Sequence, residues 1–242
     1  MTPKRARGAF ATTRWTIVNA VRQTSESQAA KALAELCEAY WPPLYGYLRR
    51  QGYRPEEAQD LTQGFFARLL ETESIRTADR GRGRFRSFLL TALKRHAINE
   101  HERSAAACRG GGHAHLSLDF DEAERAYARE PRTDETPDLL FDRRWAAIAL
   151  DRALQRLRAE YTELGRAPVA DALLPYLTDT GELPPYRTVA AQLEISEGAV
   201  KVAVHRMRQR YGAILRSEIA ETVLGEEEVE AELRELLRAV ST

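Results

Sequence analysis

"EISEGAVKVAVHRMRQRY", residues 194–211, combines small apolar residues at three- and four-residue spacing with a row of basic side chains. This spacing is the period of one face of an α-helix. Ser196 precedes the periodic residues and is placed to cap the helix by accepting a hydrogen bond from a free amide of the first turn. The basic residues of the stretch are Lys201, His205, Arg206, Arg208 and Arg210. The pattern predicts a helix with an apolar inner face and a cationic outer face.

A shorter helix is predicted directly before it, in "RTVAAQLE", residues 187–194. Small residues at Ala190 and Ala191 allow two helices to approach closely, as the tight turn of a helix-turn-helix requires. Ile195 is expected to fill the corner between the helices. The residues expected to face inward are Val189, Leu193, Val200, Ala203, Val204 and Met207. With these residues inside, Lys201, His205 and Arg208 share the outward stripe, and Arg206 and Arg210 flank it.

A helix of this width fits the major groove of DNA, where its outer side chains reach base edges and phosphates. Residues 185–216 carry six Arg or Lys against two Glu, a local charge of +4. The plainer alternative is a solvated amphipathic helix on the surface of the protein. The preceding helix, the cap and the local charge agree with one another, and together they favour DNA contact.

The whole composition excludes several other classes. The 242 residues suffice for two domains, and 36 basic against 36 acidic residues give no overall attraction to nucleic acid or membrane. No apolar run is long enough to span a membrane, and two distant cysteines, Cys37 and Cys108, favour a reducing compartment. We therefore expect a cytoplasmic protein that does not bind a membrane.

Enzymatic chemistry finds little support in the sequence. We find no glycine-rich phosphate loop and no Cys-His nucleophile pair. The glycine-rich "CRGGGHAH" at 108–115 reads as a flexible loop, and His96 and His101 are five residues apart, which does not place both on one helical face. The prediction is a protein that is not an enzyme, with no cofactor and no metal site.

Charge changes sign from block to block along the chain. Residues 80–103 have a local charge of +5, residues 117–142 have −6, and residues 218–238 have −6. The acidic stretch at 117–142 contains Pro131 and Pro137 and follows "RGGGH", so it reads as a linker. The glutamate-rich tail has Val229, Leu233, Leu236, Leu237 and Val240 along one predicted helical side. This tail either packs as an ordinary terminal helix or folds back on the basic recognition surface and restrains it.

No part of the chain has the alternation of a strand, so the predicted class is all-α: two helical domains joined by an acidic linker, the second containing the helix-turn-helix. The predicted parts are an N-terminal extension at 1–26, a first domain at 27–103, a flexible linker at 104–142, a second domain at 143–220 and an acidic C-terminal helix at 221–242.

Over most of residues 27–220 the sequence resembles the bacterial RNA polymerase sigma factors of the extracytoplasmic-function (ECF) type. "DLTQGFFARLL" is similar to the family's helix that binds the polymerase clamp, and the resemblance assigns polymerase binding to Asp60, Leu61 and Gln63. The chain departs from the family at Gly64, where an acidic residue is usual.

Two further segments carry the resemblance. "GRFRSFLLTALKRHAINEHER", residues 83–103, is similar to the segment that opens and reads the minus-10 element; basic and planar side chains suit separated single strands. The residues assigned to it are Arg84, Arg86, Lys94, Arg95 and Asn99.

The terminal block resembles the domain whose helix-turn-helix reads the minus-35 element, and residues 161–185 lengthen the connection before it. The residues assigned there are Ser196, Lys201, His205, Arg206, Arg208 and Arg210.

The resemblance implies a sigma factor that binds core RNA polymerase and directs promoter-specific initiation. Its partners would be core RNA polymerase, promoter DNA as duplex and as melted single strand, and in some members an anti-sigma factor. The linker would thread a basic cleft, although acidic linkers are also commonly just solvated. The alternative is a stand-alone helix-turn-helix regulator that does not bind core polymerase.

Overall fold

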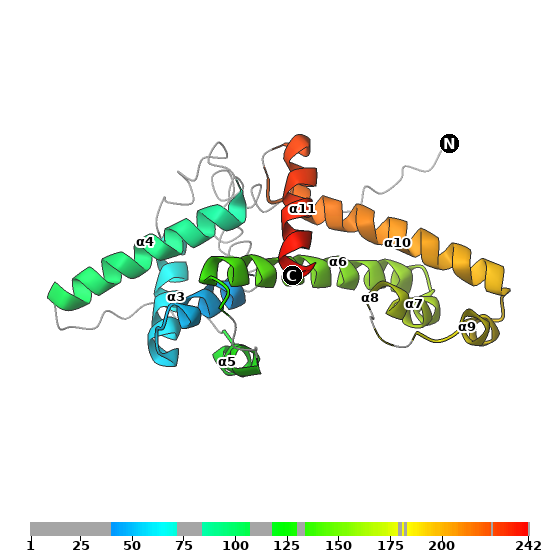
Figure 1. The fold of residues 1–242 in the computed structure, drawn as a ribbon, viewed down its shortest axis with the longest axis horizontal. Helices are drawn as coiled ribbons and strands as arrows, with labels where there is room; N and C mark the ends of the chain where they lie inside the picture. The colour runs from blue at the N-terminus through cyan, green and yellow to red at the C-terminus, as the bar shows by residue number, and fades with distance from the viewer. Residues whose placement is uncertain are drawn as a thin grey trace, which may run out of the picture. The chain divides into compact units, whose positions relative to one another are not determined.

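The computed structural model describes residues 40–71, 84–106, 118–129, 134–178, 181, 183–223 and 225–241. Over these ranges the chain forms helices joined by turns and contains no strand, which confirms the all-α class. Residues 40–50 are helical. The helices that follow are α3 (Pro55–Glu71), α4 (Phe85–Ala106), α5 (Phe120–Arg129), α6 (Pro137–Glu163), α7 (Ala167–Leu173), α8 (Pro175–Thr178), α9 (Tyr186–Leu193), α10 (Glu197–Ala220) and α11 (Glu226–Ser241) (Figure 1).

The described residues divide into two compact units. Unit 1 contains the residues up to Trp145 together with those from Ala220 onward, and unit 2 contains Ala146–Ile219. Helix α6 therefore contributes its first nine residues, 137–145, to unit 1 and the rest to unit 2. Helix α11 belongs to unit 1, although it comes last in the sequence.

Unit 1 has an aromatic core assembled from distant parts of the chain. The ring of Tyr40 stacks on that of Trp145 at 4.2 Å between centroids and meets Phe85 edge-on at 5.8 Å. All three side chains are almost completely buried. Each aromatic ring of this size removes a large apolar area from water, so these contacts stabilise the packing of α4 and α6 on the helix at 40–50.

The predicted linker at 104–142 contains ordered helical segments. In α5, Phe120 is buried, and its ring lies 4.8 Å from that of Trp41 and 5.4 Å from that of Tyr45. Glu124 of the same helix accepts hydrogen bonds from Tyr45 at 2.5 Å and from Arg49 at 2.8 and 2.9 Å. A flexible coil therefore does not describe residues 118–129, because one aromatic anchor and one charged anchor fix α5 to the first helical block.

The start of α6 also departs from the linker prediction. Pro137 occupies the first helical position, which needs no amide donor, and the Thr136 hydroxyl accepts from the Leu139 amide at 3.3 Å. Leu140 and Phe141 are buried in unit 1. The proline that suggested a linker thus marks the start of a long helix.

In unit 2, α7 contacts both α8 and α9. The stretch at 161–185, where the sequence is longer than the family pattern, contains α7 and α8 and buries Leu173 and Tyr176. Tyr176 stacks on Tyr186 at the start of α9, with 5.1 Å between ring centroids. The additional residues are therefore part of the packing that supports α9.

Candidate nucleic-acid interface

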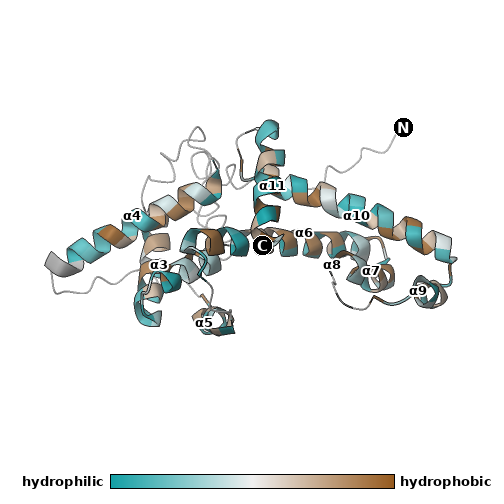
Figure 2. Ribbon diagram, in the orientation of Figure 1, coloured by the Kyte–Doolittle hydropathy of each residue, from teal (hydrophilic) through white to brown (hydrophobic). Residues whose placement is uncertain are grey.

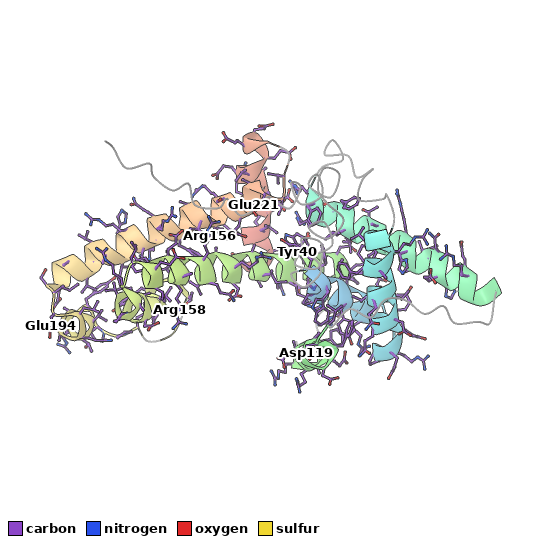
Figure 3. The ribbon with its side chains drawn as sticks, turned by 180° about the vertical axis from the view of Figure 1, so that it is seen from behind. Tyr40, Asp119, Arg156, Arg158, Glu194 and Glu221 are labelled. Carbon is purple, nitrogen blue, oxygen red and sulfur yellow. The ribbon has the colours of Figure 1, made fainter. Side chains whose placement is uncertain are left out.

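Helices α9 and α10 are joined by the three-residue turn 194–196. Glu194, labelled in Figure 3, has a left-handed backbone with φ of 55°, and its amide and that of Ile195 both bond to the carbonyl of Ala190. The Ser196 hydroxyl accepts from the Ala199 amide at 3.2 Å, so the predicted cap is present. The turn fixes the direction in which α10 leaves α9.

The inner face of α10 is well defined. Val200, Val204 and Met207 are at most 2% exposed, which confirms their predicted inward orientation. Figure 2 shows hydrophilic and hydrophobic residues interleaved along this helix. Since successive residues are about 100° apart, the direction opposite these three is occupied by Val202 and Gln209, and both are exposed. The outward face is thus centred on Val202 and Gln209, which the sequence reasoning missed.

One corner residue differs from its prediction. Ile195 was expected to fill the corner between the helices, but it is 41% exposed. Val189 and Ala190 of α9 and Val200 of α10 are all buried near this turn.

Three of the predicted contact residues of α10 interact with other parts of unit 2. The Arg208 guanidinium donates to the Tyr176 carbonyl at 2.9 Å, and that of Arg210 donates to the Glu160 carboxylate at 2.6 and 2.7 Å. The ammonium group of Lys201 lies 5.7 Å from the centre of the Tyr186 ring. Arg208 lies toward the side of the helix, where α8 supplies an acceptor, so it is not on the central outward stripe.

His205 and Arg206 have a different environment. Both are exposed, and within the part of the chain that the structure describes no hydrogen bond or ion pair holds either side chain. They flank Val202 on the outer face of α10, one turn toward the C-terminus. This face combines an apolar centre with cationic or titratable side chains at its border.

The basic segment of α4 is organised in another way. Arg84 and Arg86 form an ion-pair cluster with three carboxylates, which we call the arginine cluster: Arg84, Arg86, Asp142, Glu232 and Glu235. Glu232 is completely buried; its carboxylate accepts from Nε of Arg86 at 2.7 Å and lies 2.9 Å from Nε of Arg84. Arg86 also donates to Glu235 at 2.9 Å and to Asp142.

The prediction that Arg84 and Arg86 contact DNA does not fit this arrangement of the cluster. Arg86 is 5% exposed and is bound to carboxylates of α6 and α11, and the Arg84 guanidinium is bound to two carboxylates of α11. Burial lowers the pKa of Arg86, but the hydrogen bonds and charges of Glu232 and Asp142 together outweigh this and raise the pKa. Hydrogen bonding to Arg84 lowers the pKa of Glu235. These pKa shifts favour the ionised forms of Arg86 and Glu235.

Helix α11 reaches these arginines through an amphipathic face. Val229, Leu233, Leu236 and Ala239 are buried on it together with Glu232. Leu237 was predicted on the same side but is 41% exposed. The polar contacts of α11 described so far lie within unit 1, and Ala239 adds another by accepting from Arg143 at 2.9 Å. These contacts agree with the alternative in which the tail packs as an ordinary terminal helix, here beside α4 and the first residues of α6.

The remaining predicted residues of α4 are more accessible. Lys94 pairs with Asp138 at 2.5 Å and lies 5.2 Å from the Tyr47 ring centre. Arg95 and Asn99 are exposed, and among the described residues neither side chain has a hydrogen-bond partner. Ile98 lies between them on the same face and is 58% exposed. Phe85, by contrast, is in the core.

Helix α3 carries the predicted polymerase-binding residues. Asp60 is exposed, and Leu61 and Gln63 are half-buried beside it. Gly64 is buried, so the position at which the chain departs from the family pattern faces the interior rather than a partner. Thr62, between them, is buried and bonds to the Ala58 carbonyl at 2.6 Å. The accessible part of the motif is thus centred on Asp60.

Among the described residues, no three His, Cys, Asp or Glu side chains are grouped so that they could hold a metal ion. The stretch 108–115 lies outside the described residues. None of the helices that the structure describes is long and apolar enough to cross a membrane.

Residues 36–106 match the family model of sigma-70 region 2. No curated protein and no solved structure matches the chain. The matched segment includes the helix at 40–50, α3 and α4, and therefore Asp60, Arg95 and Asn99. Sigma-70 region 2 belongs to non-enzymatic transcription initiation factors and contacts core RNA polymerase and melted promoter DNA. Over these residues the chain is therefore similar to sigma-70 region 2.

Proposed function

We propose that this protein is a sigma factor of the extracytoplasmic-function type that gives core RNA polymerase its promoter specificity in the cytoplasm. The single observation that carries the proposal is the region 2 match at residues 36–106. We propose that α3 docks on core polymerase through Asp60 and Gln63, with Leu61 at the edge of the contact.

The exposed face of α4 is the best candidate for contact with melted promoter DNA. Arg95 supplies a cation, Asn99 an amide that can bond to base edges, and Ile98 an exposed apolar surface. Single strands are held by basic surfaces together with side chains on which bases pack. Lys94 would add a second cation to this DNA contact if its ion pair with Asp138 broke. Arg84 and Arg86 do not take part, because they are bound to carboxylates of α11.

Helix α10 is the best candidate for reading the duplex upstream. Its cap, its buried inner face and its exposed His205 and Arg206 support insertion into a major groove. We expect Lys201→Ala or His205→Ala to change promoter choice. Arg206→Ala should weaken binding to all sequences, because a guanidinium at the groove edge contacts phosphates.

The first test is a pull-down of purified bacterial core polymerase with the full chain. The wild type should retain core, and the double variant Asp60→Ala, Gln63→Ala should lose most of this retention. Glu56→Ala is the matched control, since Glu56 is also an exposed polar residue of α3.

A second step examines transcription with the reconstituted holoenzyme on genomic fragments. Specific transcripts that require the full chain would support the proposal. A chain that binds duplex DNA but never retains core polymerase would instead be a stand-alone regulator, and this result would overturn the proposal.

A further inference from the structure

Val202 is an apolar side chain in an unexpected place. Among the described residues of α10 it is the large hydrophobic side chain that is exposed, at 50%. The interior of unit 2 does not use it, because Val200 and Val204 on either side already fill the inner face. A single exposed apolar residue is common on protein surfaces. Here, however, it is at the centre of the face that we propose to enter DNA.

Gly198 lies one helical turn before Val202 on the same face. A methyl group in place of its hydrogen would meet only the Ser196 hydroxyl, at 3.9 Å. Its φ is not in the left-handed region. Neither packing nor backbone geometry therefore requires glycine, although glycine is a poor helix former.

The position of Gly198 affects access to Val202. Helical side chains point back toward the N-terminus, so that of Val202 extends over the turn that contains residue 198. Because residue 198 has no side chain, the surface above the valine is open. The cationic Arg206 and the titratable His205 border it on the other side.

The chemistry of base edges then selects a ligand. The major groove presents donors, acceptors and one apolar group, the C5 methyl of thymine. We propose that Val202, left open by Gly198, receives the C5 methyl group of a thymine in the upstream promoter element. This inference rests on the proposed duplex contact of α10 and names a base that this contact specifies.

The test uses the holoenzyme formed from the full chain and core polymerase. Its preferred upstream element is first selected from a random duplex library. Each thymine of that element is then replaced by deoxyuridine, which removes the methyl group and leaves every hydrogen-bonding group in place. We expect one position at which this replacement weakens wild-type binding about fourfold, the value for one buried methyl group.

Three variants separate the causes. Val202→Ala should make binding insensitive to the methyl group at that position, and Gly198→Ala should reduce the sensitivity by covering the valine. Leu164→Ala, a change at an apolar residue of unit 2 that is 69% exposed, is the control and should keep the full fourfold effect. Circular dichroism verifies that each variant remains helical.

The outcomes are distinguishable. If the selected element contains no thymine sensitive to deoxyuridine, or if Val202→Ala retains the sensitivity, the inference is wrong while the sigma-factor proposal stands. If the chain never forms a promoter-binding holoenzyme, the proposed function fails and this inference fails with it.

Discussion

The basic segment of α4 and that of α10 look alike in the sequence but differ in how their charges are used. At the start of α4 and within it, Arg84, Arg86 and Lys94 are paired with carboxylates, and Arg95 is the exposed exception noted above. In α10, Arg206 is exposed without such a partner among the described residues. The local charge of a segment therefore does not measure the charge that it can offer to a nucleic acid.

The partners explain the difference. The carboxylates that bind Arg86 come from Asp142, 56 positions away, and from Glu232 and Glu235, 146 and 149 positions away. A count over neighbouring residues cannot include them. An arginine already paired within the protein releases no counterions from DNA, so only the unpaired cations contribute to salt-dependent binding.

The largest expected effect follows from removing the buried carboxylate of the cluster. Glu232→Ala should lower the free energy of unfolding of unit 1 by about 3–5 kcal/mol, because Arg84 and Arg86 lose their shared buried partner. Urea denaturation in a Trp15→Phe background, followed by the fluorescence of Trp41 and Trp145, measures it. Glu227→Ala, at an exposed residue of the same helix, is the control and should cost less than about 1 kcal/mol. Equal small losses for both variants would mean that the cluster is not a stabilising feature.

A smaller effect is expected for duplex binding. Arg206→Ala should reduce the slope of log affinity against log salt by about 1, since one phosphate contact is lost. Arg84→Gln should leave this slope unchanged, because Arg84 is held by Glu232 and Glu235. Fluorescence anisotropy of holoenzyme on promoter DNA between 50 and 200 mM salt, a range of roughly fourfold, measures both. A reduced slope for Arg84→Gln would show that the cluster opens on DNA. It would contradict the statement that paired arginines do not contribute to salt-dependent binding.

Arg210 of unit 2 is intermediate between the paired arginines of the cluster and the unpaired Arg206. Arg210 is bound to Glu160, and Glu160→Gln should release much of its charge. Duplex affinity should then rise a few-fold at low salt, with a steeper salt slope. Glu163→Gln, at an exposed residue of the same helix, removes an equal charge without freeing an arginine. If both variants raise affinity equally, net charge and not Arg210 explains the effect.

The smallest expected effect is the loss of stability of unit 1 at acidic pH. Hydrogen bonds from Arg84 and Arg49 lower the pKa of Glu235 and Glu124, respectively, from the ordinary 4.5. These groups therefore stabilise unit 1 above pH 4.5, and the stabilisation is lost as the pH falls through their folded-state pKa values. Thermal unfolding between pH 7 and pH 3 should show a falling midpoint below about pH 4.5. Glu235→Gln should flatten this fall, and an unchanged pH profile would contradict the prediction.

Local patterns were sufficient to predict the fold class and much of α10. Apolar spacing placed Val200, Val204 and Met207 inside, and the position of Ser196 identified the cap, because both depend on residues within a few turns of one another. The same spacing placed the outward centre incorrectly. It grouped Arg208 with Lys201, whereas the structure turns Arg208 toward Tyr176.

Long-range contacts were beyond the reach of the sequence pattern. Helix α5 is fixed by Phe120 against Trp41 and by Glu124 against Arg49, pairs about 75–79 positions apart. The acidic composition of α5 instead favoured the prediction of a flexible linker. Likewise, nothing near Arg86 indicated that a helix at 226–241 would bring Glu232 to it.

The place of α11 in unit 1 bears on the order in which the chain acquires its structure on the ribosome. Residues 146–219 are contiguous, so unit 2 can fold as soon as they emerge. The amide of Phe85, the first residue of α4, donates to the Thr222 carbonyl at 2.9 Å. Arg86 cannot pair with Glu232 until that residue has been synthesised. At about 5–20 residues per second, the N-terminal helices wait several seconds for these partners. The first part translated is thus among the last completed, and nascent α4 displays uncompensated positive charge in the interval.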